Sequence, residues 1–268
     1  MSLREMRLTY IGGPTALIEI GGLRFLTDPT FDPAGTEYPT PVYTLRKTQD
    51  PAIRATDLEP VDVVLLSHDH HFDNLDHAGR VVVNAAPRVL TTEAGAGRLG
   101  GRTTGLAPGQ SVTIPTPDGR LLTVTATPGR HGPPDGDRGP VIGFVIADID
   151  EQNGVVYLSG DTVWYEGVAA VARRFSVFVA VLFAGAARVQ AVGPAALTFT
   201  AAELVQASRV FDQAAIVPLH FEGWAHFSES RDAIAEAFVA ANLIERLRWP
   251  QPGRALRFDQ FGPGISFT

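Results

Sequence analysis

A short apolar run, Val61-Asp-Val-Val-Leu-Leu66, is the feature of this sequence that most narrows its possible folds. Polar residues bound the run on both sides, and such a run is typical of a β-strand that is buried on both faces. A strand of this kind requires packed layers on each side of its sheet. The sequence therefore predicts a layered protein in which a polar loop directly follows a buried strand.

Further β-prone segments are spread along the chain and are interrupted by turn signals. Three short runs between residues 7 and 27 are separated by Gly-Gly pairs, a pattern typical of β-hairpins. The segment from Asp28 to about Pro60 is rich in Pro, Thr and Asp, and we expect a long loop there, of the kind that often forms a lid or a binding loop. The other expected strands lie at residues 88–91, 111–114, 121–127, 141–147, 155–159, 177–183 and 215–219.

Helices are fewer and lie between the strands. Thr200 and Glu203 fit a capping box at the start of one helix, Ser228 is expected to cap a second, and a third is expected over residues 167–174. Many strands with several separated helices predict an α+β or α/β sandwich of packed layers. Because no linker, charge block or low-complexity tract divides the chain, we expect residues 1–268 to form a single domain.

Composition and charge exclude several classes of function. The chain has no cysteine, so any metal ion must take nitrogen and oxygen ligands. The formal net charge is −7 without a dense run of Lys or Arg, which argues against nucleic acid as a partner. The longest apolar stretch, residues 177–187, is far shorter than the ~20 residues of a membrane span. No secretory signal is evident, so we expect a cytoplasmic protein, and the sequence does not predict its oligomeric state.

Histidines are rare in this chain and are clustered. Four of the seven, His68, His70, His71 and His77, fall within ten residues directly after the apolar run. The same ten residues hold three aspartates, and the strand before them fixes where the loop starts. A metal site requires such convergence, because several imidazoles must lie within about 2.1 Å of one ion. The alternative is a solvated polar loop, and the density of potential ligands argues against it.

Three more polar elements each follow another expected strand. They are His131 in a Gly- and Pro-rich loop, the Gly160-Asp161 pair, and His220. Each one alone is weak evidence, because surface histidines and Gly-Asp turns are common. Since strand ends position the loops that follow them, the four elements together predict a metal site built from strand-end loops.

The order of these elements resembles the metallo-β-lactamase superfamily, which has an H-x-H-x-D-H loop, a later single His, a Gly-Asp pair and a final His. The likeness covers nearly the whole chain. The segment from Gly12 to Pro29, which ends Leu-Thr-Asp-Pro, resembles the branch that includes ascorbate-6-phosphate lactonase and phospholipase D-type hydrolases. The resemblance implies an α+β fold, a four-layer αβ/βα sandwich with the metal site at one edge of the two packed sheets.

The family pattern transfers to this chain with one departure. The second histidine of the loop is ambiguous, because spacing from His68 selects His70, whereas spacing from Asp73 selects His71, which we favour. Asn74 stands where the family usually has a histidine for a second ion, and a neutral amide is a weaker ligand than imidazole. The number of ions is therefore one or two. The residues that match family ligands without ambiguity are His68, Asp73, His131, Asp161 and His220.

The resemblance also implies the chemistry. A divalent metal, most often zinc with manganese or iron as alternatives, would activate a water molecule to attack a small-molecule ester, lactone or phosphoester. In a two-metal version, Asp161 would bridge the ions. Asp73 would bind one ion and orient the attacking water or accept its proton. Asp73 and Asp161 are therefore the expected catalytic residues.

Three other residues have less specific expected roles. Asp28 is expected either to hydrogen-bond a ligand histidine or to form a turn before Pro29. His226 follows His220 closely and could contact a substrate. Trp164 lies near the Gly-Asp loop and is expected either to line a substrate pocket or to pack in the core. His77 is not expected to be a ligand.

Two alternatives compete with a hydrolase that acts on small molecules. A nucleic acid processing member of the superfamily commonly carries an added binding region and a basic surface, and this chain shows neither. A catalytically weak or inactive metal-binding member with a regulatory role is kept open by Asn74. An inactive site, however, is expected to have lost more than one ligand.

Overall fold

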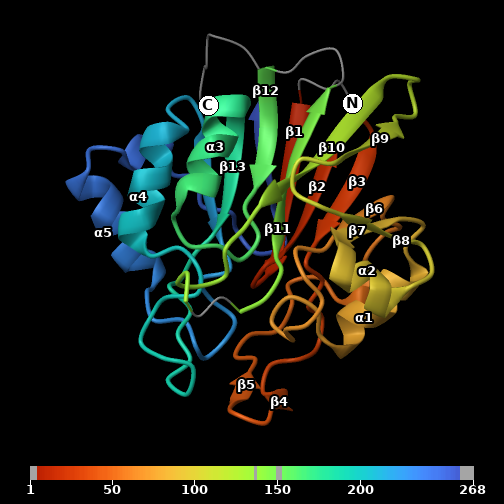
Figure 1. Ribbon diagram of the computed structural model, residues 1–268. Coiled ribbons are helices and arrows are strands. Elements are labelled where there is room, and N and C mark those ends of the chain that lie inside the picture. The colour runs from red at the N-terminus through yellow and green to blue at the C-terminus, as the bar shows by residue number, and fades with distance from the viewer. Residues whose placement is uncertain (1–4, 136–137, 149–152, 260–268) are drawn as a thin grey trace.

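Two β-sheets form the centre of the protein (Figure 1), in a computed structural model that describes residues 5–135, 138–148 and 153–259. The seven-stranded sheet has the order β15-β1-β2-β3-β6-β7-β8, and the six-stranded sheet has the order β14-β13-β12-β11-β10-β9. The strands of the first sheet are β1 (Glu5–Gly12), β2 (Thr15–Ile20), β3 (Leu23–Thr27), β6 (Val63–Leu65), β7 (Val89–Thr92), β8 (Thr103–Leu106) and β15 (Ala255–Asp259). Those of the second are β9 (Ser111–Pro115), β10 (Leu121–Pro128), β11 (Ile142–Asp148), β12 (Asn153–Leu158), β13 (Ser176–Phe183) and β14 (Ala215–Leu219).

The sheets pack face to face through alternate residues of their strands. In β13, Val179, Val181 and Phe183 belong to the core between the two sheets. The intervening Ala180 and Leu182 belong to a second core on the opposite face of the same sheet. Successive side chains of a strand point to opposite faces, so a strand with layers on both sides buries all of them.

Helices cover the outer faces of both sheets (Figure 1). On the six-stranded sheet these are α3 (Glu166–Arg174), α4 (Ala201–Val210) and α5 (Arg231–Ala240), and beside β6, β7 and β8 they are α1 (His77–Ala85) and α2 (Glu93–Leu99). The layers run helix, sheet, sheet, helix, which confirms the expected α+β, four-layer sandwich. In the part of the chain that the structure describes, no helix is both long and apolar enough to cross a membrane.

Strand direction brings several loops to one edge of the sandwich. Strands β3, β6, β7 and β8 are mutually parallel, and so are β12, β13 and β14. Strand β10 runs in the direction of β12, because both are antiparallel to β11. A backbone hydrogen bond of 3.1 Å from Ile142 N to the carbonyl of Ser67 joins the two sheets at this edge. The loops that follow β3, β6, β10, β12 and β14 therefore emerge close together.

The segment over residues 28–60 is more regular than the long loop expected from its composition. It contains a two-stranded sheet of β4 (Glu37–Pro39) and β5 (Thr44–Arg46), and a 3-10 turn at Ala55–Asp57. The hairpin projects beyond the edge at which the strand-end loops meet (Figure 1).

One of the two expected helix caps is correct and the other is wrong by two residues. Thr200 caps α4 with the complete capping box that includes Glu203. Helix α5 is capped by Ser230 and not by Ser228. The hydroxyl of Ser228 is already engaged, because it donates a 2.6 Å hydrogen bond to the carbonyl of Ala186.

Candidate metal centre

Five strand-end loops meet at this edge and bring together polar residues that are far apart in the sequence. Asp28 follows β3, residues 67–76 follow β6, His131 follows β10, Asp161 follows β12 and His220 follows β14. Strand ends are rigid, so side chains carried just after them are held in fixed positions. This arrangement places the expected ligands around two adjacent points.

Three histidines face the first of these points. The distance from His68 Nε2 to His71 Nδ1 is 3.0 Å, and that from His131 Nε2 to His71 Nδ1 is 3.2 Å. Ligand atoms about 2.1 Å from a tetrahedral ion lie about 3.4 Å from one another. The three nitrogens are therefore spaced as ligands of one ion.

The protonation states of two of these histidines suit metal binding. Burial, followed by the charge of His71, holds the pKa of His68 well below its usual range. Burial and the neighbouring His131 lower the pKa of His71 to about 3. Both rings are neutral at pH 7, so each has a lone pair available for a metal ion.

Asp161 lies between the first point and the second. Its Oδ2 is 3.5 Å from His131 Nε2, and its Oδ1 is 3.5 Å from His220 Nε2. The carboxylate is buried, and neither oxygen accepts a hydrogen bond from any residue that the structure describes. Burial raises the pKa of Asp161, but the charge of His220 outweighs it and holds the pKa well below its usual range.

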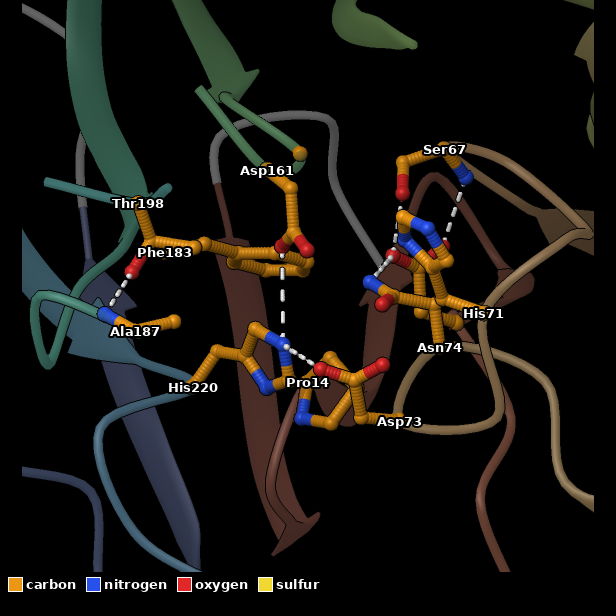
Figure 2. Close-up of polar contacts among 12 residues, drawn as sticks. Pro14, Ser67, His71, Asp73, Asn74, Asp161, Phe183, Ala187, Thr198 and His220 are labelled. Atoms are coloured by element: carbon orange, nitrogen blue, oxygen red, sulfur yellow. Dashed lines mark hydrogen bonds and ion pairs between the residues drawn. The ribbon is translucent and has the colours of Figure 1, made fainter. Parts of the chain in front are cut away.

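Asp73 and His220 form the second cluster with Asp161. Figure 2 shows the His220 ring between the two carboxylates, with Nε2 3.6 Å from Asp73 Oδ2. Burial opposes protonation of His220, but the two carboxylates outweigh it and raise its pKa to about 10. His226 also faces this cluster, with its Nε2 3.1 Å from Asp73 Oδ2.

The chemistry of this donor set fits divalent metal ions. A buried carboxylate without hydrogen bonds is costly unless a cation compensates its charge. Asp161 is such a carboxylate, and its two oxygens face different clusters. Imidazole nitrogens and carboxylate oxygens at these spacings are ligands that zinc accepts, and manganese and iron bind similar sets.

The extra residue of the histidine loop turns His70 away from the cluster. One nitrogen of His70 lies within 4.8 Å of the facing nitrogens of His68 and His71. The His70 ring is nevertheless exposed, and its Nε2 lies 2.9 Å from the carbonyl oxygen of Arg138. His71 is enclosed between His68 and His131, so the geometry favours His71 as the ligand.

A chain of hydrogen bonds orients His68. Asp28 accepts hydrogen bonds of 2.6 Å from the backbone N–H of Ser67 and 2.5 Å from its hydroxyl. The Ser67 oxygen is 2.9 Å from His68 Nδ1, which leaves Nε2 facing the cluster. Asn74 also donates to Asp28, at 3.0 Å. Asp28 therefore acts on a ligand histidine through Ser67, a link that nothing in the local sequence pattern signals.

Removal of the Ser67 hydroxyl should weaken metal binding. In Ser67→Ala, His68 loses the contact that fixes its ring, and the loss of such an orienting partner typically costs about 10- to 100-fold in metal affinity. Isothermal titration of chelator-treated protein with zinc measures the change. Ser111→Ala is the matched control, because Ser111 lies on the edge strand β9 and, among the described residues, its hydroxyl contacts only Thr125 of β10. Equal zinc affinities in the wild type and Ser67→Ala would rule out the orienting role.

The glycine of the Gly-Asp pair is required by close packing between two ligand loops. Gly160 has a φ of +60°. A Cβ at this position would lie 2.6 Å from the carbonyl oxygen of Ile142 and 2.8 Å from Cβ of Ser67. Only glycine tolerates both the backbone conformation and the approach, so Gly160 lets the Asp161 loop lie against the loop that carries His68.

A small pocket opens beside the two clusters, with a volume of about 10 Å³, which is close to the space of one water molecule. Trp164 does not line it; the ring packs against the core beneath α3 and α4, and its backbone N–H donates to Glu203. Sequence reasoning missed Tyr43 and Arg138, which come from loops without a recognisable motif. The lining residues are Tyr43, Leu45, His71, Asp73, His131, Arg138, Ala187, Val189, Leu197 and His226.

The sequence is similar to those of known metal-dependent hydrolases. The family described as the beta-lactamase superfamily domain matches residues 23–221. A metal-dependent hydrolase of Methanosphaerula palustris is 28% identical over 260 residues, which cover 92% of this chain and 98% of that protein. Another, of Opitutus terrae, is 31% identical over 232 residues, which cover 81% of this chain and 85% of that protein.

Solved structures of other proteins, two of them described as hydrolases, have the same fold as this chain. The isothiocyanate hydrolase from Delia radicum gut bacteria has a TM-score of 0.78 and 24% identity, and the match covers 95% of this chain and 100% of that one. A possible metal-dependent hydrolase from Veillonella parvula also has a TM-score of 0.78, with 21% identity and coverage of 93% and 98%. At these identities the similarity establishes a shared fold.

Proposed function

Since this chain belongs to the metallo-β-lactamase superfamily and is a metal-dependent hydrolase, we propose that it hydrolyses a small ester, lactone or phosphoester with two divalent ions, most compatible with zinc. The observation that carries this proposal is Asp161, a buried carboxylate whose oxygens lack hydrogen bonds among the described residues and face two separate clusters. A carboxylate in this position would hold both ions.

When bound, the two ions lower the pKa of a water molecule toward neutrality and stabilise negative charge that develops on the substrate oxygen. Asp73 holds its Oδ2 between His220 and His226 at the wall of the pocket. In this position it orients the attacking water and accepts its proton. Asp161 and the histidines fix the geometry, so that little reorganisation is required during the reaction.

The lining of the pocket supports a small substrate. One wall is made of aliphatic side chains, among them Val189 and Leu197, which suit an acyl or alkyl group. Arg138 supplies the single cationic side chain among the lining residues, and it suits a carbonyl or phosphoryl oxygen. The side chain of Tyr43 packs against this aliphatic wall and also lines the pocket.

Hydrolysis of a substrate panel tests the proposal. Chelator-treated protein is reloaded with zinc, manganese or iron and assayed on small activated esters, lactones and phosphodiesters, with an alkyl isothiocyanate added because one structural neighbour is named for that activity. Turnover is expected to require metal and to fall by at least about 100-fold in His68→Ala, because loss of a ligand removes organised charge from the site.

His77→Ala is the matched control for this experiment. His77 belongs to the same histidine-rich segment, but it begins α1 and its side chain is exposed. Its removal should leave turnover unchanged. Wild-type turnover that persists in chelator-treated protein or in His68→Ala would overturn the proposal.

The alternative of an inactive metal-binding member is not favoured. Several relatives with similar sequences are named metal-dependent hydrolases. The departure at Asn74, which kept this alternative open, leaves the other expected ligands in place around the two clusters.

A further inference from the structure

We propose that His226 is a ligand of the second metal ion and completes the set formed by Asp73, Asp161 and His220. This inference rests on the two-metal function proposed above. It assigns to His226 a direct bond to the ion, in place of the substrate contact expected from its position in the sequence.

Three spacings among these donor atoms fit a tetrahedral site, and one of the three involves His226. His226 Nε2 lies 3.1 Å from Asp73 Oδ2, His220 Nε2 lies 3.6 Å from the same oxygen, and His220 Nε2 lies 3.5 Å from Asp161 Oδ1. These distances bracket the separation of about 3.4 Å that neighbouring ligands have around a tetrahedral ion. The triad of Asp73, Asp161 and His220 supplies three ligands, and His226 is placed to supply the fourth.

The backbone around His226 is anchored on both sides. Trp224 forms a β-bridge with Lys47, and Phe227 forms a second β-bridge with Ala187. The N–H of Arg188 donates a 2.9 Å hydrogen bond to the carbonyl of His226 itself. The segment after β14 thus folds back across the edge of the sandwich where the two clusters lie. It places His226 beside the Asp73 carboxylate, which His220 also faces.

The His226 ring is largely withdrawn from solvent, with 11% of its side chain exposed. Its Nδ1 is buried and has no hydrogen-bond partner among the described residues, so no protein contact there competes for the ring. The ring of Phe227 packs against both His226 and His220, with centroid distances of 4.7 and 4.9 Å. Phe227 therefore contacts both of the imidazoles that face Asp73.

Asn74, in the histidine-rich loop, does not supply an imidazole to the second cluster. The Asn74 amide nitrogen donates to Asp28 at 3.0 Å, and the residue is fully buried there. Among the histidines and acidic residues of the loop over residues 67–76, Asp73 alone belongs to the second cluster, and the neutral amide of Asn74 is a weaker ligand than imidazole. An imidazole for the fourth position has to come from another segment, and the segment after β14 offers His226.

Scalar coupling between cadmium and histidine nitrogen tests the bond directly. Protein containing ¹⁵N-labelled histidine is loaded with ¹¹³Cd²⁺, and coupling is observed only for nitrogens bonded to the metal. One cadmium resonance should couple to three imidazoles, those of His68, His71 and His131. The other should couple to two, those of His220 and His226. In His226→Ala, the second resonance should lose one of its couplings or disappear.

Metal titration provides an independent measure. Loss of a residue that only orients a ligand lowers metal affinity by about 10- to 100-fold. Loss of a direct ligand in His226→Ala should therefore lower the affinity for the second ion by at least about 100-fold. The affinity for the first ion should be unchanged. His77→Ala is the control for removal of a histidine. The thermal unfolding midpoint of the metal-free variant, compared with that of the wild type, verifies that the fold is retained.

The outcomes separate this inference from the proposed function. A wild-type protein that binds fewer than two ions would overturn the two-metal function. Two bound ions with only one histidine coupled to the second resonance would leave that function standing and overturn the role of His226. An affinity for the second ion in His226→Ala that equals that of the wild type would also overturn it.

Discussion

Replacement of Asp161 by asparagine is expected to lower kcat/KM by at least about 10³-fold, the largest effect of any single change in the site. Removal of one preorganised charged or polar group from an active site typically costs about 10²- to 10³-fold, and Asp161 faces both clusters. Asparagine has nearly the same shape, but its NH2 group cannot bind a metal ion. In the proposed two-metal site one ion would therefore lose this ligand, and the negative charge between the two clusters would be lost as well.

Two measurements check this prediction. The first is kcat/KM on the best substrate of the panel, and the second is the rise in unfolding temperature on addition of zinc. A ligand stabilises the folded protein by an amount that grows with the logarithm of one plus its concentration divided by Kd, so weaker zinc binding reduces the rise in unfolding temperature. Asp135→Asn is the control, because Asp135 lies on the loop after His131 and its side chain is exposed. A variant that retained two tightly bound ions and wild-type turnover would remove Asp161 from the proposed mechanism.

The convergence of the candidate ligands could be predicted because each of them follows a strand. His68, His131, Asp161 and His220 all come directly after runs of apolar residues, and a buried strand is among the clearest local signals in a sequence. Parallel strands then bring their carboxyl ends to one edge, so the convergence of these residues follows from the order of the strands.

The choice between His70 and His71 could not be made from spacing, because long-range contacts decide it. The Asp69 carboxylate, buried in the same loop, accepts two hydrogen bonds from Arg98 at the end of α2. His70 turns outward to the carbonyl of Arg138. Arg98 and Arg138 are about 30 and 70 residues away, and no local pattern links them to the loop. The same limit hid the position of His226 beside Asp73.

Helices α1 and α2 were missed because their sequences disfavour helix. Helix α1 contains three consecutive valines, Val81 to Val83, and β-branched residues lose side-chain freedom in a helix. Helix α2 contains two glycines in seven residues. Packing against the first sheet overrides these propensities. Asp76, interpreted as part of the polar loop, is the N-cap of α1 and accepts the N–H of Gly79 at 2.7 Å.

Replacement of Lys47 by methionine should cause the largest loss of stability. Lys47, the only lysine of the chain, is buried and its Nζ lies 3.1 Å from Asp76 Oδ2, whose side chain is fully buried. Removing one partner of a buried ion pair leaves the other charge uncompensated, at a cost of about 3–5 kcal/mol. Urea unfolding of the metal-free protein, compared with that of the wild type, measures the difference in free energy.

The double variant Lys47→Met/Asp76→Asn tests whether this loss arises from the uncompensated charge. Asparagine keeps an oxygen to cap α1 but carries no charge, so it should recover part of the stability that Lys47→Met loses. Arg54→Met is the control, since it removes an exposed ion pair with Asp57 and should leave stability unchanged.

Because Lys47 ends the hairpin that carries Tyr43 and Leu45, its loss should also loosen one wall of the pocket and raise KM. Stability of Lys47→Met equal to that of Arg54→Met would show that the buried pair does not hold this hairpin against the metal-binding loop.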